Sequence, residues 1–580
     1  MRNDEIADAF AELADRLALT DEKPFRYMAY RKADSTFREL GQSVAVLSRE
    51  GRLREIDGIG PAIEEKVQQL LETGSFPALD RAREQVDDTL LALTRLPGIG
   101  PATAHKVFAA ADGEGFDSLV ERAGTGQLAT GAGITKKVLA ALADEHERRR
   151  GGGASVDPSL SGVPRDEHGE PLPGPWFRRD QAQTQLAAVI TLLLQGDDAR
   201  VEVGGEYARG CELVSGLELQ LVAGDSEDLA GIHERAASAL NDQGHDVVAT
   251  SGDGEFELAC VSPNGMPIHV DVRAADERSA HALQLLIGPP AWSTLVDEPR
   301  AGEVAPELRE RVVAGELPLA AAADLSRELV RVEDLRGDLH GHSDWSDGRA
   351  TILEMAHAAR ARGDAWYLVS DHSAPYAMVG GLDEARLLAQ ADEIARVNEQ
   401  LQREHEHDGA PAFRVLHGSE VEILGDGSLG LPDSALQRLD WVVASIHVAQ
   451  KQSADAILQR MQRVVSNPLV DAIGHPTSRR LLRRERTALD VDALIAMAHE
   501  HDVVLEVNAN PDRLDLDSTH AARALAAGVR LTINCDAHRP DNLDLRIHGV
   551  QVARRAGARA RDVVNCLPLE ELLGSRRRDR

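Results

Sequence analysis

The pattern of apolar and polar residues changes twice along the chain. Residues 5–17 and 33–47 carry apolar side chains at three- and four-residue spacing, which predicts amphipathic helices. A further helix is predicted at 181–194, and short strands are predicted at 201–203, 217–222, 246–250 and 268–272. From residue 334 onward, strand-like runs alternate with amphipathic helices, which is typical of βα repeats that close into a barrel. The pattern therefore predicts a multidomain protein with an all-α N-terminal region, an α/β unit and a C-terminal barrel.

Composition limits the number of domains, the cellular compartment and the kinds of partner that we expect for the protein. A chain of 580 residues is too long for one hydrophobic core, which agrees with several domains. The 64 Lys and Arg against 96 Asp and Glu leave a formal charge of -32. Such acidity argues against electrostatic capture of nucleic acid over the whole surface, although it is compatible with a local basic groove. The four cysteines form no Cys-x-x-Cys pair, which is typical of a reducing cytoplasm and argues against a structural zinc site.

Neither a signal peptide nor a membrane span is expected from the sequence. The first residues lack the apolar core of a signal peptide, and the best apolar run, at 186–194, is too short to cross a bilayer. We expect a cytoplasmic protein without a membrane partner.

A motif that occurs twice marks the N-terminal region. Residues 56–60 and 96–100 both end in Gly-Ile-Gly, and each is followed by a predicted helix with a lysine at the same offset. These repeats resemble helix-hairpin-helix motifs, with a degenerate third copy at 131–137. Glycines let backbone N–H groups at a helix N-terminus approach a phosphate, where the helix dipole also favours the anion. Two copies favour binding of a nucleic-acid backbone over a role as plain helix connectors, and the candidate DNA-binding residues are Gly58, Gly60, Lys66, Gly98, Gly100 and Lys106.

Candidate metal ligands recur at the ends of apolar runs in the predicted barrel. Parallel barrels build their active sites where the carboxyl ends of the strands converge. Six histidines and three carboxylates at such places make chance an unlikely cause and predict a polynuclear metal site. They are His340, His342, Asp347, His372, Glu420, His447, His475, Asp536 and His538. Imidazole and carboxylate without thiolate suit zinc, manganese or iron.

The order of these parts is similar to bacterial and archaeal X-family DNA polymerases that carry a C-terminal polymerase-and-histidinol-phosphatase (PHP) domain. Residues 25–33 also resemble the first-helix signature of that family. The resemblance implies an α/β nucleotidyltransferase-like palm and a distorted (β/α)7 PHP barrel. It also implies a domain plan: a lyase-like helical domain at 1–85, a fingers-like helical domain at 86–150, a linker at 151–175, a palm at 176–290, a connector in place of the thumb at 291–333 and the PHP domain at 334–580.

The resemblance assigns roles in the barrel residue by residue. It implies up to three divalent ions, most readily Mn or Zn, and phosphoester hydrolysis in which Glu420, Asp536 and Arg479 are catalytic, with Arg479 as a phosphate clamp. Asn508, Asn510 and Arg513 match a family segment that lines the substrate cleft. The implied ligand sets are His340, His342, Glu420 and Asp536 for one ion, Glu420, His447 and His475 for a second, and Asp347, His372 and His538 for a third. The basic run formed by Arg480, Arg483, Arg484 and Arg486 is interpreted as a DNA-backbone contact or as a solvated helix.

The palm, by contrast, lacks the carboxylates of a polymerase. Nucleotidyl transfer needs an Asp-x-Asp pair and a third carboxylate on a neighbouring strand to hold two divalent ions. The third is Asp271, but the pair becomes Gly216 and Glu218 in one register and Glu218 and Gln220 in the other. Residues 292–334 are also too few for the family's thumb. We therefore expect polymerase activity to be weak or lost, and Mg²⁺ to bind only if the palm is active.

Together these features predict a metal-dependent DNA 3′-end-processing nuclease of base-excision repair. The expected activity is that of a 3′–5′ exonuclease, abasic-site endonuclease or 3′-phosphatase, and the expected substrates are gapped, nicked or recessed 3′ DNA. Lys66 matches the family position of a Schiff-base lysine in abasic-site lyase chemistry, and its alternative interpretation is a lysine that faces a phosphate. The oligomeric state is open, with a monomer expected.

Three alternatives use the same residues differently. The first is an active X-family repair polymerase with a PHP exonuclease, in which Glu218, Asp271 and Glu212 rebuild the ion site. The second is a small-molecule phosphatase similar to histidinol phosphatase. The third is a DNA scaffold without catalysis, which a complete set of nine ligands argues against.

Overall fold

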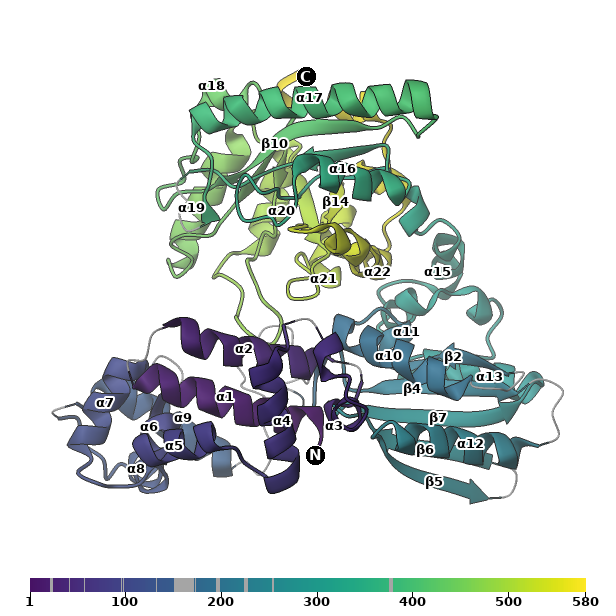
Figure 1. Cartoon of the computed structure of the whole chain (residues 1–580). Helices are drawn as coiled ribbons and strands as arrows, with labels where there is room; N and C mark the ends of the chain where they lie inside the picture. The colour runs from purple at the N-terminus through teal and green to yellow at the C-terminus, as the bar shows by residue number, and fades with distance from the viewer. Residues whose placement is uncertain are drawn as a thin grey trace. The chain divides into compact units, whose positions relative to one another are not determined.

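The computed structural model describes most of the chain (Figure 1). The described residues are 1–20, 24–40, 42–56, 58–94, 96, 99–131, 133–150, 172, 174–194, 199–223, 228–252, 255–374 and 379–579. They fall into two compact units. The first contains the described residues of Met1–Pro158, Arg165–Glu202 and Ser215–Ser279, and the second contains those of Val203–Val214 and Ala280–Arg580. Most of the predicted linker at 151–175 lies outside the described residues.

The N-terminal region is all-helical, as predicted, and has two hydrophobic cores. One core surrounds Phe10 and Phe37 in the first five helices, and the other surrounds Leu93 and Val107 in the next four. The helices are α1 (Asn3–Leu19), α2 (Pro24–Glu39), α3 (Val44–Arg49), α4 (Pro61–Thr73), α5 (Pro77–Gln85), α6 (Asp88–Thr94), α7 (Pro101–Ala110), α8 (Phe116–Gly124) and α9 (Lys136–Arg150).

The prediction of one continuous helix at 33–47 is wrong, because α2 ends at Glu39 and α3 begins at Val44 as a separate helix. The buried Asn3 side chain holds this break: its amide donates to the carbonyl of Leu40 at 3.2 Å and its oxygen accepts from the amide of Val44 at 2.8 Å. Ser43 then caps α3 by accepting from the amide of Val46. A long-range contact from Asn3 thus overrides the local periodicity.

The α/β unit contains a mixed five-stranded sheet of order β2-β4-β7-β6-β5. β7 runs parallel to β4 and antiparallel to β6. Helices α10 and α12 pack on the sheet (Figure 1). The elements are β1 (Phe177–Arg178), α10 (Arg179–Leu193), β2 (Ala199–Val203), α11 (Gly205–Ala208), β3 (Leu213–Val214), β4 (Leu217–Ala223), α12 (Leu229–Asp242), β5 (Asp246–Gly252), β6 (Glu255–Val261), β7 (Pro267–Ala274) and α13 (Glu277–Ile287). The sequence prediction missed β6, although polar and apolar residues partly alternate along it.

Short helices connect this region to the barrel. They are α14 (Arg309–Val313) and α15 (Leu319–Ser326), with 3-10 turns before them, and they enclose a small core around Trp292. The Arg309 guanidinium stacks 4.9 Å from the centre of the Trp292 ring.

The C-terminal region forms a nearly closed barrel of seven parallel strands in sequence order, which confirms the predicted fold class. The strands are β8 (Gly337–Asp338), β9 (Trp366–Val369), β10 (Arg414–Glu422), β11 (Trp441–Ser445), β12 (Ala472–Ile473), β13 (Val504–Asn508) and β14 (Leu531–Asn534). A bridge between Gly341 and Ala537 joins the first and last strands at their carboxyl ends, where the amide of His342 donates to the carbonyl of Ala537 at 2.8 Å. This bridge brings the two ends of the barrel sequence to the same mouth.

Helices surround the barrel, and the candidate metal ligands gather at its mouth. The helices are α16 (Ile352–Ala361), α17 (Glu384–Asp408), α18 (Asp433–Leu436), α19 (Ala454–Ser466), α20 (Val491–His501), α21 (Ser518–Ala526), α22 (Arg546–Ala556) and α23 (Leu569–Gly574). Apolar side chains such as Leu368, Leu416 and Val443 form one buried cluster below the mouth. Among the described residues, no helix is long and apolar enough to cross a membrane.

Candidate metal centre

The barrel gathers all nine predicted ligands at the carboxyl ends of its strands. They form four overlapping groups, and within each group the potential ligand atoms lie within 4.8 Å of one another. The groups are His342, Asp347, His372 and His538; His340, Glu420 and His475; His340, His342 and Asp536; and His372, Glu420 and His447. The shared members make this one continuous cluster.

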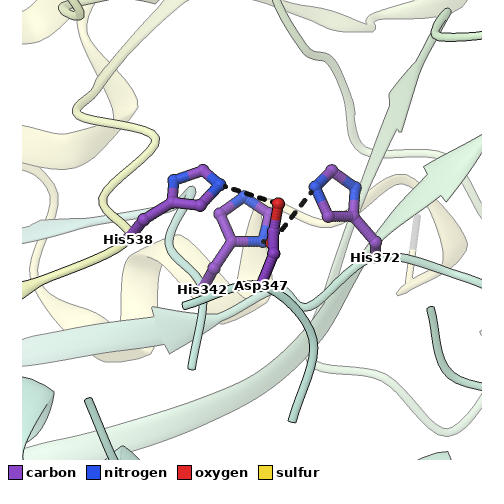
Figure 2. A group of neighbouring side chains, drawn as sticks. All are labelled: His342, Asp347, His372 and His538. Carbon is purple, nitrogen blue, oxygen red and sulfur yellow. Dashed lines mark ion pairs between the residues drawn. The ribbon is translucent and has the colours of Figure 1, made fainter. Parts of the chain in front are cut away.

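Asp347 is the centre of the outer group (Figure 2). Its carboxylate lies 3.4 Å from Nε2 of His538, 3.6 Å from Nε2 of His372 and 4.0 Å from Nδ1 of His342. Three imidazoles therefore point at one half-buried carboxylate.

Glu420 is the centre of the inner groups. It lies on β10, and its side chain is 1% exposed. Oε1 is 2.9 Å from Nε2 of His475 and 3.3 Å from Nε2 of His447. Oε2 is 2.9 Å from Nδ1 of His372 and 3.4 Å from Nε2 of His340. Each carboxylate oxygen thus faces two imidazole nitrogens, which is the arrangement of a bridging ligand.

The grouping differs in one respect from the ligand sets that the resemblance implies. His342 was assigned away from Asp347, yet its Nδ1 faces that carboxylate while its Nε2 is 3.0 Å from Oδ1 of Asp536. His372 likewise faces both Asp347 and Glu420. These two histidines connect the outer and inner groups, and the division of the nine ligands among ions stays a prediction.

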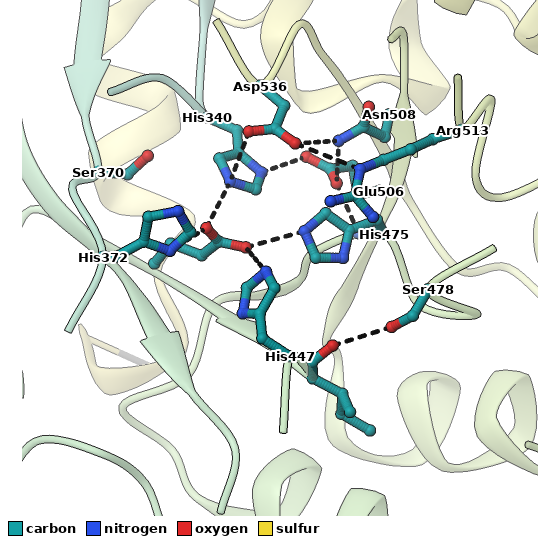
Figure 3. A network of polar contacts seen from close by, with 12 residues as sticks. His340, Ser370, His372, His447, His475, Ser478, Glu506, Asn508, Arg513 and Asp536 are labelled. Atoms are coloured by element: carbon teal, nitrogen blue, oxygen red, sulfur yellow. Dashed lines mark hydrogen bonds and ion pairs between the residues drawn. The ribbon is translucent and has the colours of Figure 1, made fainter. Parts of the chain in front are cut away.

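Glu422 and Glu506, which the sequence interpretation missed, orient the histidines from behind. Figure 3 shows Glu506 beside His340 and His475. Glu422 accepts from Nδ1 of His447 at 2.8 Å and from the backbone amide of the same residue at 2.9 Å. Glu506 binds Nδ1 of His340 at 2.8 Å and the amide of His475 at 2.6 Å. Such contacts fix the tautomer and leave the other ring nitrogen for a metal. A charged residue inside an apolar strand was the available sequence signal.

Asp371 supports the cluster on another side. Its carboxylate accepts from the amide of Ser343 at 2.9 Å and from the side chain of Gln390 at 2.6 Å. These contacts hold the loop that follows β8 and carries Asp347.

Electrostatics divide the histidines into two kinds. Burial lowers the pKa of His342 to about 3, and the neighbouring His538 and His372 add to this shift. Burial and the charge of Arg513 lower the pKa of His475 to about 4. For His538, burial is outweighed by Asp347 and Asp536, and its pKa is raised to about 9. His342 and His475 are thus neutral near pH 7, with lone pairs available to a cation.

The carboxylates stay charged although they are buried. Burial favours the neutral form of Glu420, but His447, His372 and His340 hold its pKa well below the ordinary value. Asp536 behaves in the same way, with His340, His342 and His538 outweighing its burial. A pair of charged carboxylates among imidazoles is the donor set that divalent transition metals prefer.

Unpaired atoms give a direct test of whether a metal fits. Nε2 of His340, Nδ1 of His342, both ring nitrogens of His475 and both oxygens of Glu420 are buried without a hydrogen bond. Buried polar atoms of this kind are costly unless something binds them. Because one potential ligand atom of each residue lies within 4.8 Å of those of the other members of its group, divalent ions fit the site.

Two ligands also have strained backbones. His475 and Asp536 have φ of 25° and 52°, in the left-handed region that residues other than glycine rarely adopt. Such strain persists where surrounding contacts hold it, and it concentrates at functional sites.

The predicted phosphate clamp, Arg479, lies outside the cluster. It is buried, its Nε donates to the carbonyl of Arg513 at 2.9 Å, and its Nη2 binds Glu212 at 2.8 Å. Arg513 instead contacts the cluster, with Nε 3.5 Å from Oδ2 of Asp536 (Figure 3). Asn508 donates to the same oxygen at 3.3 Å. The geometry therefore favours Arg513 over Arg479 as the guanidinium near substrate.

The basic run at 480–486 is a loop and contains no helix. A bridge joins Arg480 to Arg484, and Asp512 pairs with Arg480 at 3.0 Å and with Arg483 at 3.3 Å. Asp512 directly precedes Arg513 in sequence, so this arginine loop borders the metal centre. The interpretation as a solvated helix is wrong. Asn510 caps the adjacent turn by accepting from the amide of Asp512.

The two Gly-Ile-Gly turns precede helices, as predicted. Gly60 and Gly100 are the N-terminal caps of α4 and α7, and open space surrounds both. Gly58 has φ of 82°, which glycine adopts readily. Gly98 lies outside the described residues. The exposed backbone at the start of each helix is compatible with an approaching anion.

The two motif lysines lie on these helices in different surroundings. Nζ of Lys66 donates to the carbonyl of Ala62 at 2.9 Å and lies 5.8 Å from the centre of the Tyr30 ring. Lys106 is exposed on α7.

The candidate palm residues do not form a comparable cluster. Strand register sets Gln220 opposite Asp271, and Glu218 opposite His269. Gln220 is 1% exposed, whereas Asp271 pairs with Arg273 at 3.1 Å. A side chain at Gly216 would meet the carbonyl of Pro267 at 2.6 Å. Within the described part of the chain, the groups able to hold a metal ion all lie in the barrel.

The fold and the site together define an enzyme of the phosphoesterase class whose barrel gathers residues able to hold divalent metal ions. Comparison with known proteins then gives the relatives. A helix-hairpin-helix domain profile matches residues 1–76, and a SAM-like helix-hairpin-helix tandem profile matches residues 50–112. The chain is 27% identical over 602 residues to the DNA polymerase/3′-5′ exonuclease PolX of Bacillus subtilis (strain 168), covering 99% of both chains.

Shorter relatives match part of the chain. A protein named probable phosphatase from Acetivibrio thermocellus is 28% identical over 211 residues, which cover 35% of this chain and 78% of that protein. Another from Aliivibrio fischeri (strain MJ11) is 29% identical over 217 residues, with 35% and 77% coverage. The resemblance to X-family polymerases that carry a PHP domain is thereby confirmed.

Proposed function

We propose that the protein is a metal-dependent DNA 3′-end-processing nuclease of base-excision repair, with 3′–5′ exonuclease activity and with polymerase activity weak or lost. The observation that carries the proposal is the gathering of nine potential ligands around Glu420 and Asp347 at one barrel mouth. The similarity to a protein named as both polymerase and 3′-5′ exonuclease supports DNA as the substrate.

We further propose that the cluster holds up to three divalent ions, Mn or Zn, with the nine residues as ligands. When bound, such ions lower the pKa of water and neutralise phosphate oxygens. In Glu420, Oε1 faces His475 and Oε2 faces His372, so one carboxylate is available to two ions. Glu422 orients the imidazole of His447, and Glu506 orients that of His340. Arg513 adds a fixed cation beside Asp536, where a phosphodiester oxygen of the substrate is accommodated.

DNA is bound, in this proposal, by backbone contacts outside the metal centre. Backbone amides in the first turns of α4 and α7, after Gly60 and Gly100, donate to phosphates of the DNA. Lys66 and Lys106 lie on the same two helices. The arginine loop at 480–486 holds the strand near the centre. Gapped, nicked or recessed 3′ ends are the expected substrates. The domain plan with boundaries at 85, 150, 175, 290 and 333 belongs to this proposal.

A single comparison tests the assignment. Wild type, His342→Ala and Asp271→Ala are incubated with a 5′-labelled duplex bearing a recessed 3′ end, in Mn²⁺, with and without dNTPs. We expect nucleolysis in wild type and Asp271→Ala, its disappearance in His342→Ala, and no primer extension in any of them. Nucleolysis that survives His342→Ala would overturn the metal-centre assignment, and extension by wild type would restore the polymerase alternative.

A second candidate function, a small-molecule phosphatase, is favoured by the similarity to the probable phosphatases. Rates on p-nitrophenyl phosphate and on recessed DNA separate the two. Fast monoester hydrolysis beside negligible DNA cleavage would favour the phosphatase.

A further inference from the structure

A segment predicted to belong to the palm lies within the same compact unit as the barrel. Val203–Val214 contains α11 and β3 and lies between β2 and β4 in the chain. Arg555 of α22 donates to the carbonyl of Arg209 at 3.0 Å and to Sγ of Cys211 at 3.4 Å. Arg209 in turn pairs with Glu310 at 2.9 Å. The segment is therefore fixed by charged contacts at several points.

Glu212 is the residue of this segment that contacts the loops next to the metal centre. Its Oε2 accepts from Nη2 of Arg479 at 2.8 Å, and its Oε1 accepts from the amide of Ser518 at 3.0 Å. The side chains of Glu212 and Arg479 are 15% and 7% exposed. Nη1 of Arg479 also lies 3.7 Å from Oδ2 of Asp517, so loss of Glu212 removes the nearer of two carboxylate partners from a buried guanidinium.

Arg479 also binds the loop that follows β13. Its Nε donates to the carbonyl of Arg513 at 2.9 Å, and its Nη2 donates to the carbonyl of Leu514. Both carbonyls belong to the turn that carries the Arg513 side chain. The position of this turn thus depends on the orientation of the Arg479 guanidinium.

Arg513 completes the connection to the metal centre. Its Nε lies 3.5 Å from Oδ2 of Asp536, and its side chain is 8% exposed (Figure 3). Asn508 donates to the same oxygen, so Oδ1 of Asp536 is left to face His342. Contacts run without a gap from Glu212 through Arg479 and Arg513 to Asp536.

We propose that Glu212 is a positioning residue for the hydrolytic site, acting through Arg479 to orient Arg513 beside Asp536. The inference rests on the proposed phosphodiesterase function and extends it to a residue outside the barrel sequence. In this proposal a segment outside the barrel sequence, Val203–Val214, serves the hydrolytic site. Its Arg209 is already engaged by Glu310 and by the carbonyl of Gly288, which leaves it unavailable to a triphosphate.

The first test uses a small substrate, so that DNA binding does not enter. Full-length wild type, Glu212→Gln and Glu212→Asp are compared on bis(p-nitrophenyl) phosphate at saturating Mn²⁺. We expect Glu212→Gln to lower kcat/KM about 10- to 100-fold, the usual effect of losing an outer contact at a metal site. Glu212→Asp should recover part of the loss because it restores the charge. Bound Mn²⁺, measured by elemental analysis, should match wild type, and the three proteins are assayed at a temperature at which thermal melting shows each of them folded.

A double-mutant cycle separates positioning from general structural support. In an Arg513→Ala background, Glu212→Gln should cause no further loss of kcat/KM, because its effect passes through Arg513. The matched control is Asp492→Asn, which breaks an exposed carboxylate pair with Arg523 of α21 at 3.0 Å and should leave kcat/KM unchanged.

The outcomes are distinguishable. Wild-type activity in Glu212→Gln, or equal losses with and without Arg513, would overturn the positioning role while leaving the proposed function intact. A wild-type protein that hydrolyses neither this substrate nor recessed DNA would overturn the proposed function, and the positioning role with it.

Discussion

The barrel and the five-stranded sheet both place polar side chains on neighbouring parallel strands, yet only the barrel surrounds them with partners. Glu420 has four imidazole nitrogens within 3.4 Å, and Glu422 and Glu506 hold two of those rings from behind. In the sheet, Asp271 lies opposite the amide side chain of Gln220 and pairs with Arg273. The difference shows that a strand-end carboxylate defines a metal site only when neighbouring strands supply further donors.

Removal of metal is expected to cause the largest change in nuclease activity, because, among the described residues, only those of the barrel form groups able to hold an ion. Dialysis against EDTA should abolish nuclease activity, and Mn²⁺ should restore it, because the buried donors of the barrel need a cation. At 100 times its Kd, a bound ion stabilises the folded state by about 2.7 kcal/mol, so Mn²⁺ should also raise the melting temperature. Differential scanning calorimetry with elemental analysis measures both. Full activity in protein shown to contain no metal would contradict the metal centre.

Glu422→Gln and Glu218→Gln make the same substitution in the two regions. Glu422 lies on β10, which pairs in parallel with β11 of the barrel, and Glu218 lies on β4, which pairs in parallel with β7 of the sheet. Glu422→Gln should lower nuclease kcat/KM about 10- to 100-fold by releasing His447, whereas Glu218→Gln should have no effect. Steady-state cleavage of a recessed duplex measures both. Equal behaviour of the two variants would remove the distinction between the barrel and the sheet.

Gln220→Asp tests whether one substitution can rebuild the palm. The new carboxylate would be buried opposite Asp271, so we expect a loss of stability of about 3 kcal/mol and no primer extension in Mg²⁺. Urea unfolding and extension of a labelled primer provide the measurements. Templated extension by this variant would show that the sheet needs only one more carboxylate.

The smallest expected effect concerns the arginine loop. Arg483→Ala with Arg486→Ala should weaken binding of recessed DNA several-fold and reduce the slope of log K against log salt by about 0.9 for each lost phosphate contact. Fluorescence anisotropy at several salt concentrations measures this slope. The control is Arg523→Ala, which removes an exposed arginine from α21. An unchanged slope would exclude the loop from the DNA interface.

Much of the fold was predictable because it depends on local pattern. The βα alternation predicted the barrel, and four of the five strands of the sheet were predicted, while β6 was missed. The helix at 33–47 was mispredicted because Asn3, some 40 residues away, breaks it by binding Leu40 and Val44. No local window contains that contact.

The site divides in the same way. Its nine candidate ligands stood out by residue type and strand-end position. Glu422 and Glu506 gave only the weaker signal of a charged residue inside an apolar strand, which does not show that they contact histidines. The resemblance implied Arg479 as the phosphate clamp and Arg513 only as a residue of the cleft lining, since sequence alone does not show which guanidinium faces the candidate ligands. Only the folded chain shows that Arg479 binds Glu212 and two carbonyls while Arg513 contacts Asp536.

By itself, the sequence determined which donors exist and that they lie at the carboxyl ends of barrel strands, because alternation and residue chemistry are local properties. The folded chain shows how those donors combine: His342 and His372 connect two groups, and Glu212, from outside the barrel sequence, contacts Arg479 in a loop next to the candidate metal centre. These relations depend on distances between residues that are up to about 300 positions apart in the chain, which are set by strand register and packing.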